Sequence, residues 1–170
     1  IDLLPSPFSH HSSVHEYGGM AYTIHDAYLY FVNAADQRIY RQHLDTLGTP
    51  IAITQKGPWR FADLIVDAQH QRLIAVCEEH QDQQEAENYL VTIALNDDRA
   101  SIKKLQSGAD FYAYPRLSPD QTRLCWIQWS HPNMPWDSSE LCLANLSQTG
   151  ISKPRVIAGS QGDEAIFQPH

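Results

Sequence analysis

Two short stretches of the sequence carry side chains that could bind a substrate or a partner, and the first is residues 15–19, HEYGG. It joins a titratable pair, His15 and Glu16, to two glycines that allow the backbone to bend sharply. Glu16 could hold the amino terminus of a substrate or an arginine of a partner. Alternatively, the glycines only permit a close approach to an inner strand, and Glu16 accepts hydrogen bonds from backbone amides. The sequence leaves both interpretations open.

The second stretch is residues 131–137, HPNMPWD, which places a histidine, an asparagine and a tryptophan around two prolines. Rigid proline backbone next to an exposed aromatic side chain suits an interface. A hairpin loop that folds Trp136 back onto its sheet would explain the same residues. No catalytic, cofactor-binding or metal-binding residue is expected. The residues predicted to lie at an interface or near a substrate are His15, Glu16, Tyr17, His131, Asn133 and Trp136.

Composition and charge exclude several classes of function. The 170 residues include 20 acidic and 12 basic side chains, which gives a formal net charge of -8. Phosphate groups require a basic field, so we expect neither nucleic acid nor an anionic membrane surface as a partner. No run approaches the roughly 18 apolar residues of a membrane span.

Three cysteines, Cys77, Cys125 and Cys142, lack the spacing of a metal site. We interpret them as buried free thiols, with a Cys125–Cys142 bridge across a hairpin as the alternative. Free thiols are typical of a reducing compartment, so the prediction is a cytoplasmic protein.

An internal repeat organises the chain. Similar segments begin at Ala21, Ala62 and Ala113, and further along each unit Leu44, Leu95 and Leu146 are spaced 51 residues apart. Each unit holds four short runs with the composition of strands, separated by turn residues. Four strands in a unit of about 40–50 residues indicate an all-β fold of the β-propeller class.

The units predict a segment of about three four-stranded antiparallel blades. We expect the end of a preceding blade and a connector at 1–20, blades at 21–58, 59–108 and 109–160, and the start of a truncated next blade at 161–170. A closed ring needs about 4–8 blades, so one copy cannot close by itself. Open blades leave two unpaired flanks, which predicts self-association, with two copies forming a six-bladed pseudo-ring.

The sequence resembles the N-terminal propeller of prolyl-oligopeptidase-family serine peptidases, in the acylaminoacyl-peptidase and dipeptidyl-aminopeptidase-like branch. The resemblance extends over nearly all residues and is carried by VHEYGG (14–19), VNAADQRIYRQ (32–42), RFADLIVD (60–67), FYAYPRLSPD (111–120) and HPNMPWDSSELC (131–142). One departure is Gln121, where the family usually has glycine. A tight turn that requires positive φ would be slightly strained there.

The resemblance implies a two-domain enzyme in which the propeller caps an α/β-hydrolase domain holding the catalytic serine, aspartate and histidine. This chain contains no G-x-S-x-G motif and no triad. The family relation thus implies a non-catalytic segment that gates and orients short peptides for a hydrolase domain on the same parent chain. The alternative is a stand-alone TolB-like propeller module for protein–protein interaction. Neither requires a cofactor.

Overall fold

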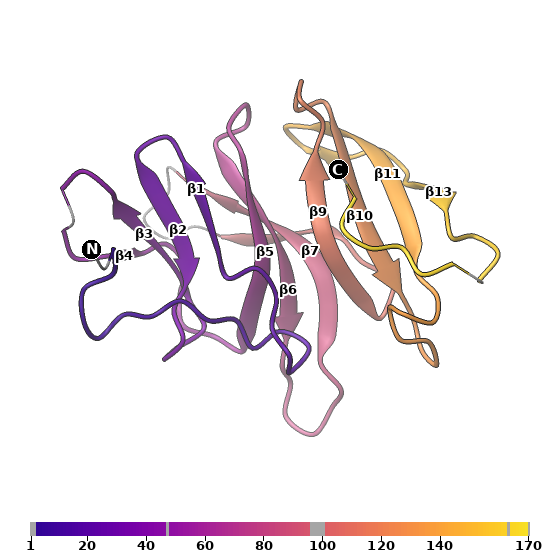
Figure 1. Cartoon of the computed structure of the whole chain (residues 1–170), viewed down its shortest axis with the longest axis horizontal. Coiled ribbons are helices and arrows are strands. Elements are labelled where there is room, and N and C mark those ends of the chain that lie inside the picture. The colour runs from indigo at the N-terminus through magenta and orange to yellow at the C-terminus, as the bar shows by residue number, and fades with distance from the viewer. Residues whose placement is uncertain (1–2, 47, 96–100, 163, 170) are drawn as a thin grey trace.

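The computed structural model describes residues 3–46, 48–95, 101–162 and 164–169. Within these ranges the regular secondary structure consists entirely of β-strands (Figure 1). The strands form three separate antiparallel sheets, which follow one another along the chain. The predicted all-β propeller segment of about three blades is therefore confirmed. Residues 1–2, 163 and 170 of the predicted terminal segments lie outside the described residues.

Each sheet is a meander in which consecutive strands are neighbours. The first sheet consists of β1 (Tyr22–His25), β2 (Tyr28–Val32), β3 (Ile39–His43) and β4 (Ile51–Ala52). The second consists of β5 (Trp59–Asp67), β6 (Arg72–Glu79), β7 (Glu87–Ala94) and β8 (Ile102–Gln106). The third consists of β9 (Phe111–Leu117), β10 (Arg123–Trp129), β11 (Glu140–Ser147), β12 (Gly150–Ile151) and β13 (Arg155–Ala158), and both short strands pair with β11.

The sheets pack face to face, with β1, β5 and β9 in contact as their inner strands (Figure 1). One apolar core lies between the first two sheets and includes Val32, Ile39 and Leu73. A second core lies between the second and third sheets and includes Ile74 and Trp126. Because the middle sheet is covered on both faces, β6 is buried continuously from Arg72 to Glu78 instead of alternating.

The turn between β9 and β10 has the geometry that its sequence predicts. Asp120 accepts hydrogen bonds from the hydroxyls of Ser118 and Thr122 and from the Thr122 amide, at 2.6–3.1 Å. These donors lower the pKa of Asp120 to about 2. Gln121, which stands at the expected glycine position, has a φ of 54°. The left-handed backbone at this position is therefore retained without glycine.

The cysteines are free thiols. Across the β10–β11 pair, Cys125 lies opposite Leu143 and Cys142 lies opposite Trp126, so the two thiols do not face each other. Burial raises the pKa of Cys142 to about 12, which keeps this thiol protonated and unreactive. The interpretation as buried free thiols holds for Cys77 and Cys142, whereas Cys125 is a free thiol that is only partly buried. The cytoplasmic location remains a prediction.

Candidate functional site

The first predicted stretch lies on a bent segment, residues 13–20, which leads into β1 and is called the strap below. His15 and Glu16 both have left-handed backbones, with φ of 53° and 64°. Gly18, with φ of 83°, comes so close to Ser12 that an added Cβ would lie 2.7 Å from its carbonyl oxygen. A Cβ on Gly19 would likewise lie 2.9 Å from the Cβ of Ala62. The strap therefore requires Gly18 where it folds back onto Ser12, and Gly19 where it crosses the inner strand β5.

Glu16 forms an ion pair with an arginine of the same chain. The Nη1 of Arg60, on β5, lies 2.5 Å from Glu16 Oε1 and 3.5 Å from Glu78 Oε2, and it also donates to the Ser13 carbonyl. The hydrogen bond from Arg60 lowers the pKa of Glu16. Glu78 is buried and also contacts the His80 imidazole at 3.0 Å. One guanidinium thus holds the strap against the middle sheet and leaves the Glu16 side chain largely exposed.

His15 lies in a cluster of aromatic rings. Its imidazole centroid is 5.7 Å from that of Tyr17, 5.3 Å from Phe111 and 5.5 Å from Trp129. Burial lowers the pKa of His15, and the Glu78 carboxylate and the neighbouring Asn88 amide oppose this shift. No hydrogen bond of normal geometry reaches either His15 Nε2 or Asn88 Oδ1. The buried His15 ring is therefore held mainly by aromatic contacts, with the Asn88 amide beside it.

A cavity of about 240 Å3, the acidic cavity, opens beside this cluster. Three carboxylates line it, those of Glu16, Glu78 and Glu85, together with the Tyr17, Phe111 and Trp129 rings. Carboxylates next to aromatic faces favour a cationic group, because both attract positive charge. The arrangement therefore suits an ammonium or guanidinium group. Among the described residues, no group of three or more metal-ligating side chains is placed to hold a metal ion.

A second cavity of about 400 Å3, the inner cavity, lies next to the first between the strap and the inner strands. The two cavities are adjacent, because His15, Tyr17 and Trp129 line both. Asp63 and Tyr114 line the inner cavity from β5 and β9. It therefore adds room for a larger, mainly apolar group beside the acidic cavity.

The second predicted stretch lies on the loop between β10 and β11 and joins the same face. The His131 ring is 5.1 Å from Phe111, and its nitrogens lie 3.2 Å from Asp110 and 3.6 Å from Glu85. Trp136 lines the inner cavity and is 65% exposed, so its ring is not folded into the sheet. Asn133 lies apart, in a cavity of about 260 Å3 that it shares with His131.

Four of the six predicted residues, His15, Glu16, Tyr17 and Trp136, thus line the two cavities, and His131 contacts the lining residues Phe111 and Glu85. All five lie on the face that carries the strap and the β6–β7 and β10–β11 loops. We call it the connector face; it lies at the lower edge of Figure 1. Sequence reasoning missed Arg60, Glu78, Phe111 and Trp129. The repeat contained a signal for them, because Arg60 and Phe111 are 51 residues apart, as are Glu78 and Trp129. Equivalent positions in successive blades lie on the same face.

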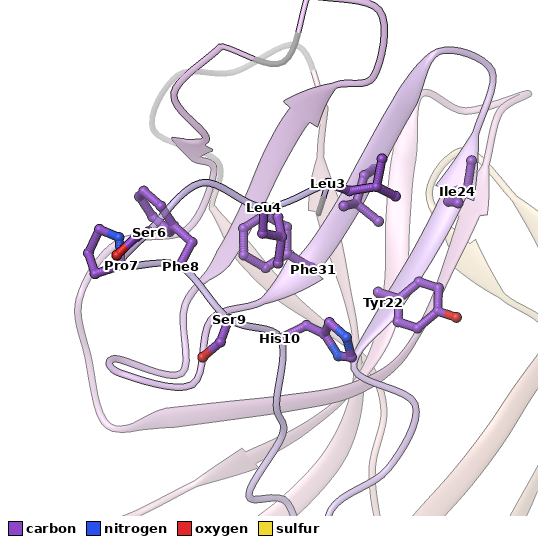
Figure 2. Close-up of a pocket in the computed structure, with 11 residues that line it drawn as sticks. Leu3, Leu4, Ser6, Pro7, Phe8, Ser9, His10, Tyr22, Ile24 and Phe31 are labelled. Carbon is purple, nitrogen blue, oxygen red and sulfur yellow. The ribbon is translucent and has the colours of Figure 1, made fainter. Parts of the chain in front are cut away.

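A larger cavity, of about 780 Å3, lies elsewhere and has a different character (Figure 2). Leu3, Leu4 and Phe8 of the N-terminal segment face Tyr22 and Ile24 of β1 across it. It opens on the side of the first sheet that faces away from the other two. It is therefore the flank of an open blade, and it lacks the carboxylates of the acidic cavity.

Solved structures similar to this chain include two puromycin-hydrolyzing enzymes that are much longer than this chain. A puromycin-hydrolyzing peptidase of Mycobacterium tuberculosis matches 95% of the chain, with a TM-score of 0.85 and 32% identity. A puromycin hydrolase matches 96% with the same TM-score and 26% identity. This chain spans 27% of the length of each. TolB from Acinetobacter baumannii matches 82% of the chain and 31% of its own, with a TM-score of 0.54 and 15% identity, which shows the fold alone.

No family model and no curated protein matched the chain. Within the described residues, there is no helix long and apolar enough to cross a membrane.

Proposed function

The chain belongs to the prolyl-oligopeptidase family, as a segment of its N-terminal β-propeller, and from this premise we propose that it gates and orients short peptides for an α/β-hydrolase domain of the same parent chain. Its contribution is to binding and access, because it contains no nucleophile elbow. A propeller face placed over a catalytic site admits short peptides and excludes folded proteins. Specificity then arises from which substrates reach the reacting groups.

The acidic cavity is the observation that supports this function best. It lies on the connector face, and its carboxylates outnumber the single arginine that neutralises them. The free amino group of a short peptide is a cation of suitable size. In this proposal Glu16 and Glu85 attract that group at the rim, while Tyr17 and Trp136 bound the space for the first side chains.

A substrate comparison in the full-length protein tests this role. Glu16→Gln should raise KM for a peptide with a free amino terminus by roughly tenfold, since a hydrogen bond to a charged group contributes about 1.5–3 kcal/mol. The same variant should leave KM for the N-acetylated peptide unchanged. Asp26→Asn, an exposed carboxylate at the opposite end of β1, is the matched control. Equal effects of Glu16→Gln on both peptides would contradict the proposed role.

A stand-alone interaction module is the alternative function. The TolB likeness supports only the shared fold. The gene sequence that encodes the rest of the polypeptide distinguishes the two functions, since a G-x-S-x-G motif after further blades is required by our proposal. Residues 1–170 produced alone should hydrolyse no peptide substrate, and cleavage by this segment would overturn its non-catalytic assignment.

A further inference from the structure

Asp63 lies where the inner strands of the three sheets meet, with only 6% of its surface exposed. The register between β5 and β6 shifts between Ala62 and Ile65, so Asp63 and Leu64 form an irregularity in the ladder. Asp63 also has a φ of 54°. Bulges of this kind re-aim a side chain, and aspartate tolerates the left-handed region better than most residues.

The re-aimed carboxylate binds backbone amides on both sides of its own strand. Its Oδ1 accepts a hydrogen bond from the Met20 N–H at 2.9 Å, and its Oδ2 accepts one from the Tyr114 N–H at 2.8 Å. The Asp63 N–H in turn donates to the Met20 carbonyl at 2.8 Å. One buried side chain thus connects the strap that leads into the first sheet with the inner strand of the third.

Both connected residues bear directly on the candidate site. Met20 is the last residue of the strap, and the strap carries His15, Glu16 and Tyr17. Tyr114 lines the inner cavity and has its own left-handed backbone, with φ of 52°. It stands 51 residues after Asp63, at the same position of the repeat. The carboxylate therefore fixes the two sides of the inner cavity relative to each other.

We infer that Asp63 is a positioning residue, whose carboxylate holds the strap and Tyr114 in the arrangement that the candidate site requires. It acts through the Met20 and Tyr114 amides. That this arrangement serves peptide binding rests on the proposed function, whereas the positioning itself rests only on the geometry. Loss of a positioning residue should affect the connector face selectively. Loss of a purely stabilising residue should not, and the two roles can therefore be distinguished by experiment.

The test compares Asp63→Asn with Asp67→Asn in the full-length protein. Asp67 is a matched control, because it lies on the same strand, is fully buried and accepts hydrogen bonds from Arg72 and His70 at 2.7 and 2.9 Å. It sits at the far end of β5, away from the strap. Both substitutions remove a buried carboxylate, so both should lower thermal stability. In Asp63→Asn the new amide group must face a backbone N–H, which leaves one donor without an acceptor.

Hydrogen–deuterium exchange of segments 13–20 and 111–117 is the first measurement. Exchange of the Met20 and Tyr114 amides should be at least about tenfold faster in Asp63→Asn, since hydrogen bonds to charged acceptors contribute more than one factor of ten. Asp67→Asn should leave both segments unchanged. The second measurement is peptide hydrolysis, in which Asp63→Asn should raise KM several-fold with kcat retained.

The outcomes separate the inference from the proposed function. Unchanged exchange in Asp63→Asn, or equally faster exchange in both variants, would overturn the positioning role. Selectively faster exchange in Asp63→Asn supports that role whatever the kinetics. If KM then stays unchanged in both Asp63→Asn and Glu16→Gln, the proposed function is wrong and the positioning role stands.

Discussion

Arg60 determines how much negative charge the acidic cavity presents. Its guanidinium is shared between Glu16 and Glu78, at 2.5 and 3.5 Å. Glu85, the third carboxylate, lies beside the His131 imidazole, at 3.6 Å. With neutral histidines, the cavity keeps a net negative charge after Arg60 is counted. The attraction for a cationic ligand therefore comes from the carboxylates that Arg60 does not neutralise.

The Arg60–Glu16 pair gives a direct electrostatic prediction. Arg60→Met should raise the pKa of Glu16 toward its ordinary value, because the hydrogen bond from the guanidinium is the main cause of its depression. An NMR titration of the Glu16 carboxyl carbon measures this. Arg38→Met is the control, since Arg38 donates to the Thr54 carbonyl and not to Glu16. A pKa of Glu16 that stayed depressed in Arg60→Met would contradict the ion pair.

His15 makes stability depend on pH. Burial lowers its pKa below 6.5, so the unfolded chain takes up a proton that the folded chain binds more weakly. The free energy of unfolding should therefore decrease as the pH falls below about 6.5 and through the lowered pKa. Asn accepts a left-handed φ, so His15→Asn should fold and show a smaller decrease between pH 7.5 and 5.5. Urea denaturation at the two pH values measures the difference.

The control for this measurement is His11→Asn, an exposed histidine on the same N-terminal segment. Because His15 is intact in that variant, the decrease in stability with falling pH should be retained. Equal pH dependence of His15→Asn and the unsubstituted chain would refute the assignment of the effect to His15.

At the scale of single residues, the sequence predicted the residues of the candidate site better than the contacts between them. Residues 15–17 were predicted from their chemistry, and in the structure all three line the acidic cavity, while His15 and Tyr17 also line the inner cavity. The repeat marks the position of Arg60, but its pairing with Glu16 could not be predicted, because the two residues are 44 positions apart in the chain. The role of Asp63 depends on a bulge, and nothing in the pattern ADLIVD distinguishes a bulged strand from a regular one.

At the scale of elements, the end of β5 opposite the connector face holds a buried ion pair that connects two blades. Asp67 Oδ2 accepts a hydrogen bond from Arg72 Nε at 2.7 Å, and both side chains are buried. The remaining Arg72 nitrogens donate to the carbonyls of Ser147 and Gln148, at the end of β11. One arginine thus satisfies a buried carboxylate and two backbone acceptors in the next sheet.

Removing this arginine should be strongly destabilising. Arg72→Met leaves Asp67 with only His70 as a side-chain partner, and loss of one member of a buried pair costs about 3–5 kcal/mol. Arg123→Met, an exposed arginine on β10, should change the free energy of unfolding by less than about 0.5 kcal/mol. Urea denaturation of the three proteins at pH 7 tests this. A loss below 1 kcal/mol in Arg72→Met would show that the ion pair does not hold the blades together.

Strands were the most predictable elements, because the 51-residue repeat and the turn residues both mark their ends. The structure places a strand in each of the second and third runs of every unit. The third sheet was less predictable, since β12 and β13 both pair with β11 where one outer strand was expected. The extra pairing depends on the tight turn at Gly150, which has a φ of 151°. The pattern of hydrophobic residues does not predict such a local backbone geometry.

At the scale of the whole molecule, the two ends of the row of sheets are open and apolar. On the first sheet Tyr22 and Ile24 are exposed beside the large cavity of Figure 2. On the third sheet Ile157 is exposed, and Leu143 is only half-buried. In a closed propeller each such face packs against another blade. The 170-residue chain produced alone leaves both faces in water.

We therefore expect two copies of the 170-residue chain to associate, each placing its first sheet against the third sheet of the other. Such a ring has two equivalent interfaces, so a single substitution acts twice. Ile24→Glu puts a charge into both interfaces and should weaken dimerisation by at least about tenfold, because burying an unpaired carboxylate is costly.

Ile51→Glu is the control, because Ile51 is similarly exposed on the same sheet but lies on the side facing the second sheet. Light scattering across a concentration series should give twice the mass of one chain for the unsubstituted protein and for Ile51→Glu, and a falling mass for Ile24→Glu. A single-chain mass at every concentration would show that the exposed flanks do not pair.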